Sequence, residues 1–174
     1  RIVKDLDNMI NSKWFLGSRL NFAENLLQFK DDKIAIYYKN EDKEICNLSY
    51  ADLYKKVERL CHSLREIGVE ENDRVVGYLP NIPETIIAML ATTSIGAIWS
   101  SCSPDFGIEG ILDRFGQSKP KILISCDGYG YGGKIFEIKK KTIEVKKSIS
   151  SINELVFVDY LSKNKEEESL SWNN

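Results

Sequence analysis

Hydrophobic and polar residues in the first part of the chain predict small, local elements. Residues 1–28 hold two short helical patterns, separated by a loop at residues 13–21. Residues 33–39 and 44–48 are rich in strand-forming side chains and flank the polar turn 40–43, a pattern typical of a β-hairpin. The sequence therefore predicts short helices and then a hairpin before the longer elements begin.

From Ser49 onward, helical spacing alternates with short apolar runs. Ser49 followed by Asp52 is the carboxylate form of a capping box, and Gly68 ends the helical pattern that follows it. Asn81 is the predicted cap of the next helix, with Pro83 in its first turn. The predicted strands are residues 74–79, 97–101, 121–126 and 154–160, and the predicted helices are residues 49–67, 81–95, 108–118 and 135–149.

This alternation of strands and helices predicts an α/β fold. Short strands that are apolar throughout are typical of a parallel sheet covered on both faces, and right-handed crossovers make it doubly wound. We expect an N-terminal helical extension at residues 1–30, an α/β subdomain at 31–161 that carries the hairpin, and a charged tail at 162–174. Ligands bind at the carboxyl ends of the strands in such sheets. The loops at these ends are residues 80–83, 100–106 and 127–134.

The composition narrows the classes of function. The chain has 174 residues, with 24 Lys and Arg against 26 Asp and Glu, so its net charge gives no reason to expect a nucleic acid as partner. No run of about 18 apolar residues exists, and the opening residues do not form a secretory signal, so no membrane role is predicted. Because the chain begins at Arg1 and ends in polar residues, we expect a piece of a longer protein.

The cysteines favour a cytoplasmic protein. Cys46, Cys61, Cys102 and Cys126 are widely spaced, and a chain long enough to bury a core does not need disulfides. Zinc would require clustered ligands, and the single histidine, His62, has no partner at a suitable spacing. Structural thiols without a metal site are therefore predicted, with Cys61 on the apolar face of a helix and Cys126 at the end of an apolar strand.

A cluster of glycines between the third long strand and the last helix is the most distinctive local feature. Gly128, Gly130 and Gly133 match G-x-G-x-x-G, and a loop that opens a helix favours a phosphate. The following helix carries an excess of lysine, which would attract an anion. Against a dinucleotide, Tyr129 and Tyr131 stand where a pyrophosphate needs close approach. A flexible surface loop stays an equal alternative.

The loop at residues 100–107 has hydroxyl and carboxylate groups but no complete catalytic set. A serine nucleophile needs a neighbouring base, and His62 lies in the middle of another predicted element. Ser103 or Asp105 is instead predicted to cap the next helix, with Pro104 fixing the turn. No catalytic residue is predicted within this chain.

Five segments of the chain form a distinctive set when they are taken together. In chain order, they are residues 14–27 (WFLGSRLNFAENLL), 77–81 (GYLPN), 96–107 (GAIWSSCSPDFG), 113–115 (DRF) and 131–134 (YGGK). This set resembles the opening part of the acetoacetyl-CoA synthetase family, within the acyl-adenylate-forming superfamily. The resemblance covers about residues 10–160, and its most specific stretch is W-S-S-x-S-P-D-F-G.

The resemblance implies a ligase that works in two steps. Acetoacetate attacks the α-phosphate of ATP in the presence of Mg²⁺, releasing diphosphate, and the thiol of coenzyme A then attacks the acyl-adenylate and releases AMP. The family's phosphate loop, adenine-binding segments, metal-binding Glu and catalytic Lys all lie farther along the chain, so this piece alone should make no acyl-CoA. In related sequences Ser171 and Trp172 would shortly precede the phosphate loop.

One binding segment carries over from the resemblance. In acetyl-CoA synthetase relatives, a short basic segment with glycines contacts the phosphates of coenzyme A. The positions that match it are Tyr131, Gly132, Gly133 and Lys134. Gly130 stands where relatives often carry an arginine, so a bidentate phosphate contact is missing and Lys134 acts as a point charge.

Three alternatives stay open at this point. The acid could be acetate or propionate, because most of the acyl pocket lies outside this chain. A nicotinamide-dependent oxidoreductase could bind NAD(P) with the loop from Gly128 to Gly133. Asp159, at the end of the next strand, would then be the acidic residue that binds the ribose. A non-catalytic remnant would present the α/β unit only as an interaction surface.

Overall fold

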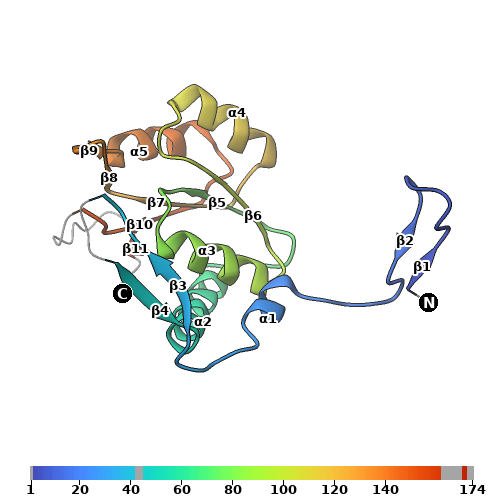
Figure 1. Cartoon of the computed structure of the whole chain (residues 1–174). Coiled ribbons are helices and arrows are strands. Elements are labelled where there is room, and N and C mark those ends of the chain that lie inside the picture. The colour runs from blue at the N-terminus through green and yellow to red at the C-terminus, as the bar shows by residue number, and fades with distance from the viewer. Residues whose placement is uncertain (1, 42–44, 162–169, 172–174) are drawn as a thin grey trace.

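A five-stranded parallel sheet lies at the centre of the molecule (Figure 1). The computed structural model describes residues 2–41, 45–161 and 170–171. The strands of this sheet are β5 (Arg74–Tyr78), β6 (Ile98–Cys102), β7 (Ile122–Cys126), β10 (Glu154–Val158) and β11 (Leu170–Ser171). Their order is β11-β10-β7-β5-β6, and every neighbouring pair is parallel. The predicted parallel sheet is confirmed.

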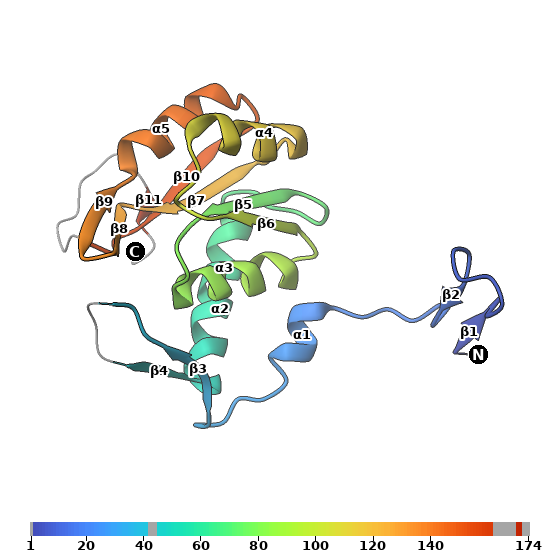
Figure 2. The ribbon, with the colours of Figure 1, turned by 45° about the horizontal axis from the view of Figure 1, so that its top comes forward.

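Helices cover both faces of the sheet. Figures 1 and 2 show α2 (Tyr50–Glu66) and α3 (Pro83–Ser94) on one face, and α4 (Ile108–Ser118) and α5 (Lys139–Ser148) on the other. All five residues of β7 are buried between these layers. This explains why the strand is apolar at nearly every position, without the alternation of a sheet that faces water. The doubly wound arrangement is therefore also confirmed.

The predicted hairpin is formed by β3 (Ile34–Tyr38) and β4 (Cys46–Ser49), which pair antiparallel. Of its predicted turn, Asp42 and Lys43 lie outside the described residues. Most of the predicted charged tail, residues 162–169 and 172–174, lies outside them too. The three domain boundaries therefore stay predictions.

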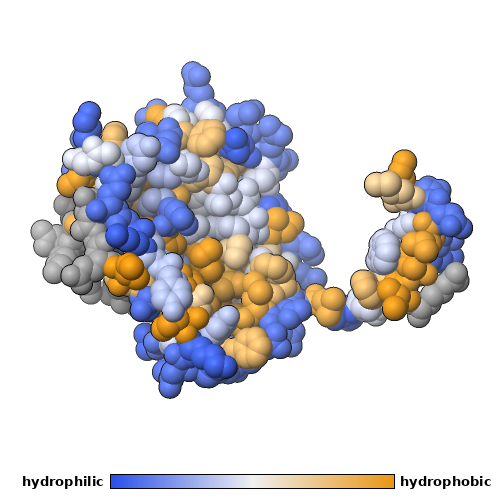
Figure 3. All heavy atoms as spheres, in the orientation of Figure 1, coloured by the Kyte–Doolittle hydropathy of each residue, from blue (hydrophilic) through white to orange (hydrophobic). Residues whose placement is uncertain are grey.

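Only one of the two helical patterns near the N-terminus forms a helix, α1 (Phe22–Leu26). The prediction of a helix before it is wrong, because β1 (Val3–Lys4) and β2 (Lys13–Trp14) pair antiparallel there. Asp5 and Phe15 have φ of 57° and 48°, values that end a regular right-handed helix. Figure 1 shows this strand pair standing apart from the body, and its apolar side chains are exposed in Figure 3.

The predicted helix caps have mixed outcomes. The hydroxyl of Ser49 accepts a hydrogen bond from the N–H of Asp52 at 3.1 Å, which confirms the cap of α2. The prediction of Asn81 as a cap is wrong, because Ile82 occupies the N-cap of α3 and its side chain makes no capping bond. Pro83 at the first helical position has no N–H, which leaves one fewer donor to satisfy. None of the described helices has both the length and the apolarity that a membrane span needs.

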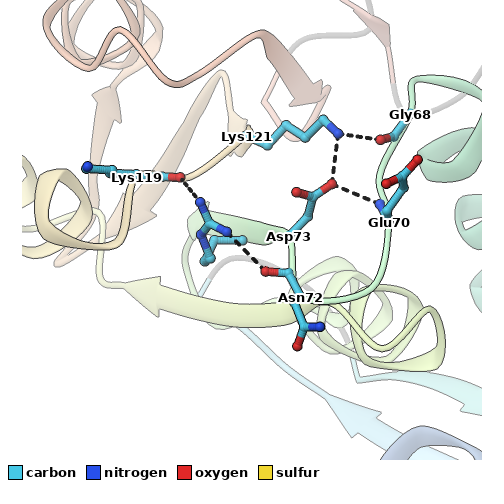
Figure 4. A network of polar contacts seen from close by, with 7 residues as sticks. Gly68, Glu70, Asn72, Asp73, Lys119 and Lys121 are labelled. Carbon is cyan, nitrogen blue, oxygen red and sulfur yellow. Dashed lines mark hydrogen bonds and ion pairs between the residues drawn. The ribbon is translucent and has the colours of Figure 1, made fainter.

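A polar network joins the amino ends of β5 and β7, opposite the edge where ligand binding is predicted (Figure 4). Lys121 donates to a carboxylate oxygen of Asp73 at 2.8 Å and also to the carbonyl of Gly68. The same carboxylate oxygen accepts from the N–H of Glu70 at 2.9 Å. The hydrogen bond from Lys121 holds the pKa of Asp73 below its ordinary value. The network thus ties the loop after α2 to the sheet.

Replacing Asp73 by Asn should destabilise the fold by about 1 kcal/mol at neutral pH, because charge-assisted bonds are lost. The folded-state pKa of Asp73 is lowered, so the unfolded state binds more protons and stability from this group rises with pH. In the wild type this contribution is complete above pH of about 4 and disappears as the pH falls through the folded pKa. Urea unfolding at several pH values measures it.

Asp31→Asn is the matched control, since Asp31 and Lys33 form an exposed ion pair at 3.3 Å. Exposed pairs contribute little, so this variant should unfold within about 0.5 kcal/mol of the wild type. Equal stability of Asp73→Asn and Asp31→Asn at neutral pH would contradict the role given to the network.

Candidate functional site

The three predicted ligand loops meet at one cavity of about 270 Å³. It lies at the carboxyl edge of the sheet, where β5, β6 and β7 end. Its walls come from the loop after β5, the loop after β6 and the glycine segment after β7, and the end of hairpin strand β3 closes one side. The lining residues include Asn40, Pro80, Asn81, Ser103, Asp105, Tyr129, Tyr131 and Tyr160. Ligand binding at this edge is expected for a doubly wound sheet.

The glycine segment has a different local structure from the predicted loop. β8 (Gly128–Tyr131) and β9 (Lys134–Glu137) pair antiparallel and are joined by Gly132 and Gly133. These two glycines have φ of 59° and 68°, which a two-residue type I′ turn requires at both central positions. A Gly-Gly pair between two short strands is itself a hairpin signal, and the fingerprint match concealed it.

This hairpin moves the last helix away from the glycines. α5 begins at Lys139, four residues later than predicted, so strand β9 separates the glycine turn from the N-terminus of the helix. The prediction of a glycine loop that opens a helix is therefore wrong. The dinucleotide fingerprint needs that strand–turn–helix geometry, and here its glycines lie in a β-hairpin. Asp159, the predicted ribose partner, does not line the cavity.

Tyr131 and Lys134 face each other across the turn of the β8–β9 hairpin. They form the last register pair before the glycines, and both side chains are exposed. The N–H of Gly133 donates to a carboxylate oxygen of Glu41 at 3.3 Å, which links the turn to the end of β3. Of the four residues predicted to contact coenzyme A, Tyr131 lines the cavity, and the other three follow it in the turn and at the start of β9.

The loop after β6 presents hydroxyl and carboxylate groups to the cavity. Tyr129 donates to one oxygen of Asp105 at 2.7 Å, and the hydroxyl of Ser103 donates to the other at 2.9 Å. These two bonds lower the pKa of Asp105, with the bond from Tyr129 contributing most. Burial and the bond to Asp105 raise the pKa of Tyr129 to about 12, so it stays a donor at neutral pH. The prediction that Ser103 or Asp105 caps α4 is wrong, since its N-cap is Gly107.

The opposite rim of the cavity is a cluster of phenols. Tyr38 and Tyr160 share a hydrogen bond between their hydroxyls at 2.6 Å, and the side-chain amide of Asn40 donates to Tyr160. Asp127 accepts from the backbone N–H groups of Tyr160 and Leu161, each at 2.9 Å. Burial raises the pKa of Tyr38 far above its ordinary value. The cluster connects the β3–β4 hairpin to the segment that follows β10.

Among the described residues, neither the histidine nor a cysteine lines this cavity. His62 lies exposed on α2, where its Nδ1 is 3.4 Å from a carboxylate oxygen of Glu66. Burial raises the pKa of the thiols of Cys102 and Cys126 to about 11 and about 12, which keeps both protonated. Cys61 is buried as predicted. The groups that line the cavity include hydroxyls, an amide and carboxylates, which can form hydrogen bonds to a ligand.

Comparison with known proteins identifies the family. The model of the AMP-binding enzyme family matches residues 22–173. The chain belongs to the AMP-binding enzyme family. This membership favours the ligase interpretation over the nicotinamide-dependent alternative.

The relatives that the chain matches carry the names of acyl-CoA synthetases. The chain is 49% identical over 147 residues to acetoacetyl-coenzyme A synthetase of Rhizobium meliloti (strain 1021), covering 84% of this chain and 23% of the relative. It is 38% identical to malonamoyl-CoA synthetase vrtB of Penicillium aethiopicum, covering 82% of this chain and 21% of the relative. The solved structure of acetoacetyl-CoA synthetase from Streptomyces lividans matches 99% of this chain and 27% of its own, with 36% identity and a TM-score of 0.91. The chain thus spans about a quarter of the length of these proteins.

Proposed function

We propose that this chain is the opening part of an acetoacetate–CoA ligase. The complete protein would join acetoacetate and ATP to an acyl-adenylate with release of diphosphate, then transfer the acyl group to the thiol of coenzyme A with release of AMP. The single observation that carries this proposal is the identity of 49% to an acetoacetyl-coenzyme A synthetase over 147 residues. ATP and coenzyme A are metabolites of the cytoplasm, and the chain's cysteines are in accord with that location.

This part of the ligase would contribute to binding and not to the chemical steps. The resemblance places the metal-binding Glu and the catalytic Lys farther along the protein, so Mg²⁺ would be held there. Coenzyme A is the substrate that the residues of this chain fit best.

The tip of the β8–β9 hairpin has the chemistry to receive a phosphate of coenzyme A. Lys134 supplies a cation, and the space beside the glycines of the turn is open, since a side-chain atom added at Gly132 or Gly133 would meet nothing within 4 Å. Lysine recognises a phosphate as a point charge. Tyr131 on the facing strand is 66% exposed and could pack beside the nucleotide. Tyr131, Gly132, Gly133 and Lys134 together form the proposed contact.

Activity of the full-length protein tests the function directly. With ATP, Mg²⁺ and coenzyme A, it should consume acetoacetate and release AMP and diphosphate in equal amounts. Acetate, propionate and malonamate are the competing acids, the last chosen because a relative is a malonamoyl-CoA synthetase. A preference for any of these over acetoacetate in kcat/KM would overturn the assignment of the substrate. The 174-residue chain alone should release no diphosphate above the blank.

Replacing Lys134 by Ala in the full-length protein should raise the KM for coenzyme A about tenfold at low salt, with the KM for ATP unchanged. A charge-assisted phosphate contact is lost, and its loss changes an equilibrium by roughly that factor. Salt screens exposed charges, so the difference should shrink at high ionic strength. Initial rates at varied coenzyme A measure the effect.

Lys55→Ala is the control, because Lys55 is exposed on α2, which covers the other face of the sheet. It should leave both KM values as in the wild type. An unchanged KM for coenzyme A in Lys134→Ala at low salt would remove the hairpin tip from the proposed site.

A further inference from the structure

The loop after β6 is held from within the molecule by side chains of two other elements. We define the 103–106 loop as Ser103–Phe106. Tyr78, at the end of β5, donates its hydroxyl hydrogen to the carbonyl of Pro104, with an O–O distance of 2.5 Å. The ammonium group of Lys141, from the first turn of α5, donates to the hydroxyl oxygen of Tyr78 at 3.1 Å and to the carbonyl of Phe106 at 3.3 Å.

A second set of bonds holds the same loop from the side of the hairpin. Tyr129 on β8 donates to the carboxylate of Asp105. The ring of Tyr129 stacks on Phe136 of β9, with centroids 5.3 Å apart and an interplanar angle of 18°. The 103–106 loop is thus connected to the β8–β9 hairpin, which carries the proposed phosphate contact. Two walls of one cavity are thereby kept at a fixed separation.

The groups of this network need their hydrogen bonds because they are buried or partly buried. Tyr78 is 1% exposed, so its hydroxyl and the loop carbonyls depend on one another for hydrogen bonds. Lys141 is partly buried, and a cation in that position needs such acceptors, since burying a charge without partners is costly. Networks of this kind favour a single arrangement of the backbone that they connect.

We propose that Tyr78 and Lys141 are positioning residues for coenzyme A, acting through the 103–106 loop that forms a wall of its cavity. This inference rests on the proposed function only for the choice of coenzyme A as the ligand. Neither side chain lines the cavity, so neither touches the ligand directly. Their role is to fix where Ser103 and Asp105 lie relative to the hairpin tip. Without them the loop would have several arrangements, and binding would have to select the competent one.

The test measures binding of coenzyme A to the full-length protein by calorimetry, together with acetoacetate-dependent exchange of diphosphate into ATP. Exchange reports the first half-reaction, which does not use coenzyme A. Tyr78→Phe and Lys141→Met each remove two hydrogen bonds of this network. Each should raise the Kd for coenzyme A about tenfold, because part of that loss passes to the ligand through the loop. Both should leave the exchange rate within about twofold of the wild type, because the loop serves the other substrate.

Conservative and distant variants separate positioning from general damage. Lys141→Arg keeps a cation and its donors, so it should bind coenzyme A more tightly than Lys141→Met. Lys55→Met removes a charge from the opposite face and should bind as the wild type does. Hydrogen exchange at the N–H groups of residues 105–107 should be faster in Tyr78→Phe.

Each outcome decides the question. Unchanged Kd values in both variants, or equal losses in exchange and in binding, would overturn the positioning role. A wild-type protein that binds no coenzyme A would overturn it as well. If the wild type binds coenzyme A and the variants weaken that binding, but acetoacetate supports no exchange, the positioning role stands and the proposed function fails.

Discussion

Leu123→Ala should destabilise the chain by about 4 kcal/mol, because it empties the centre of the hydrophobic core. Leu123 is fully buried in β7, with Val76 of β5 and Leu155 of β10 as its neighbours in the sheet. Truncation removes buried apolar area and leaves a cavity that the surrounding side chains cannot fill, and such changes cost about 2–5 kcal/mol. Urea unfolding followed by far-UV circular dichroism measures the change in the free energy of unfolding.

Leu20→Ala makes the same chemical change at a position that is 86% exposed, before α1. It should alter stability by less than about 0.5 kcal/mol, because little apolar area leaves contact with the protein. A similar loss of stability in the two variants would mean that β7 is not the centre of the core. If Leu123→Ala yields no folded protein, Leu123→Met tests the site with nearly constant volume and should cost less than about 1.5 kcal/mol.

The sheet and its covering helices could be predicted because their signals are local and repeated. Each strand is a short apolar run, and each helix has apolar residues at regular spacing, so burial on one or two faces can be recognised from the sequence. The helix that begins after Ser49 shows how specific a start signal can be, since its capping residue bonds as predicted. The predicted meeting of three loops followed from the topology alone.

The N-terminal region shows where local signals fail. The residues before the predicted loop at 13–21 have enough apolar side chains to suggest helical spacing, but a short helix is unstable without a surface to pack against. Positive φ at Asp5 and Phe15 directs the chain into a strand pair instead. The spacing of the hydrophobic residues does not predict these two backbone angles.

Parts of the candidate site depend on contacts between distant segments, which a single sequence does not reveal. The bond from Tyr129 to Asp105 joins residues that are 24 positions apart, and that from Lys141 to Tyr78 joins residues 63 apart. In the sequence, Lys141 is only one lysine of a basic helix. Its partial burial, which separates it from the exposed Lys140, is visible only in the structure.

Gly128→Ala should destabilise the chain by about 2–3 kcal/mol, which makes it the second large effect. A Cβ atom at Gly128 would lie 2.3 Å from Cδ1 of Leu161 and 2.5 Å from the carbonyl oxygen of Phe136. The leucine side chain can rotate away, but the carbonyl belongs to the paired strand β9, so the backbone of the hairpin must shift. The first residue of β8 is therefore glycine for steric reasons, since its φ is not in the positive region.

Gly116→Ala is the control for Gly128→Ala. Gly116 lies inside α4, and a Cβ there meets nothing within 4 Å. It should stabilise the chain by up to about 1 kcal/mol, since alanine is the better helix former. Thermal unfolding of both variants gives the comparison, and a neutral Gly128→Ala would show that the hairpin is not held at this close approach.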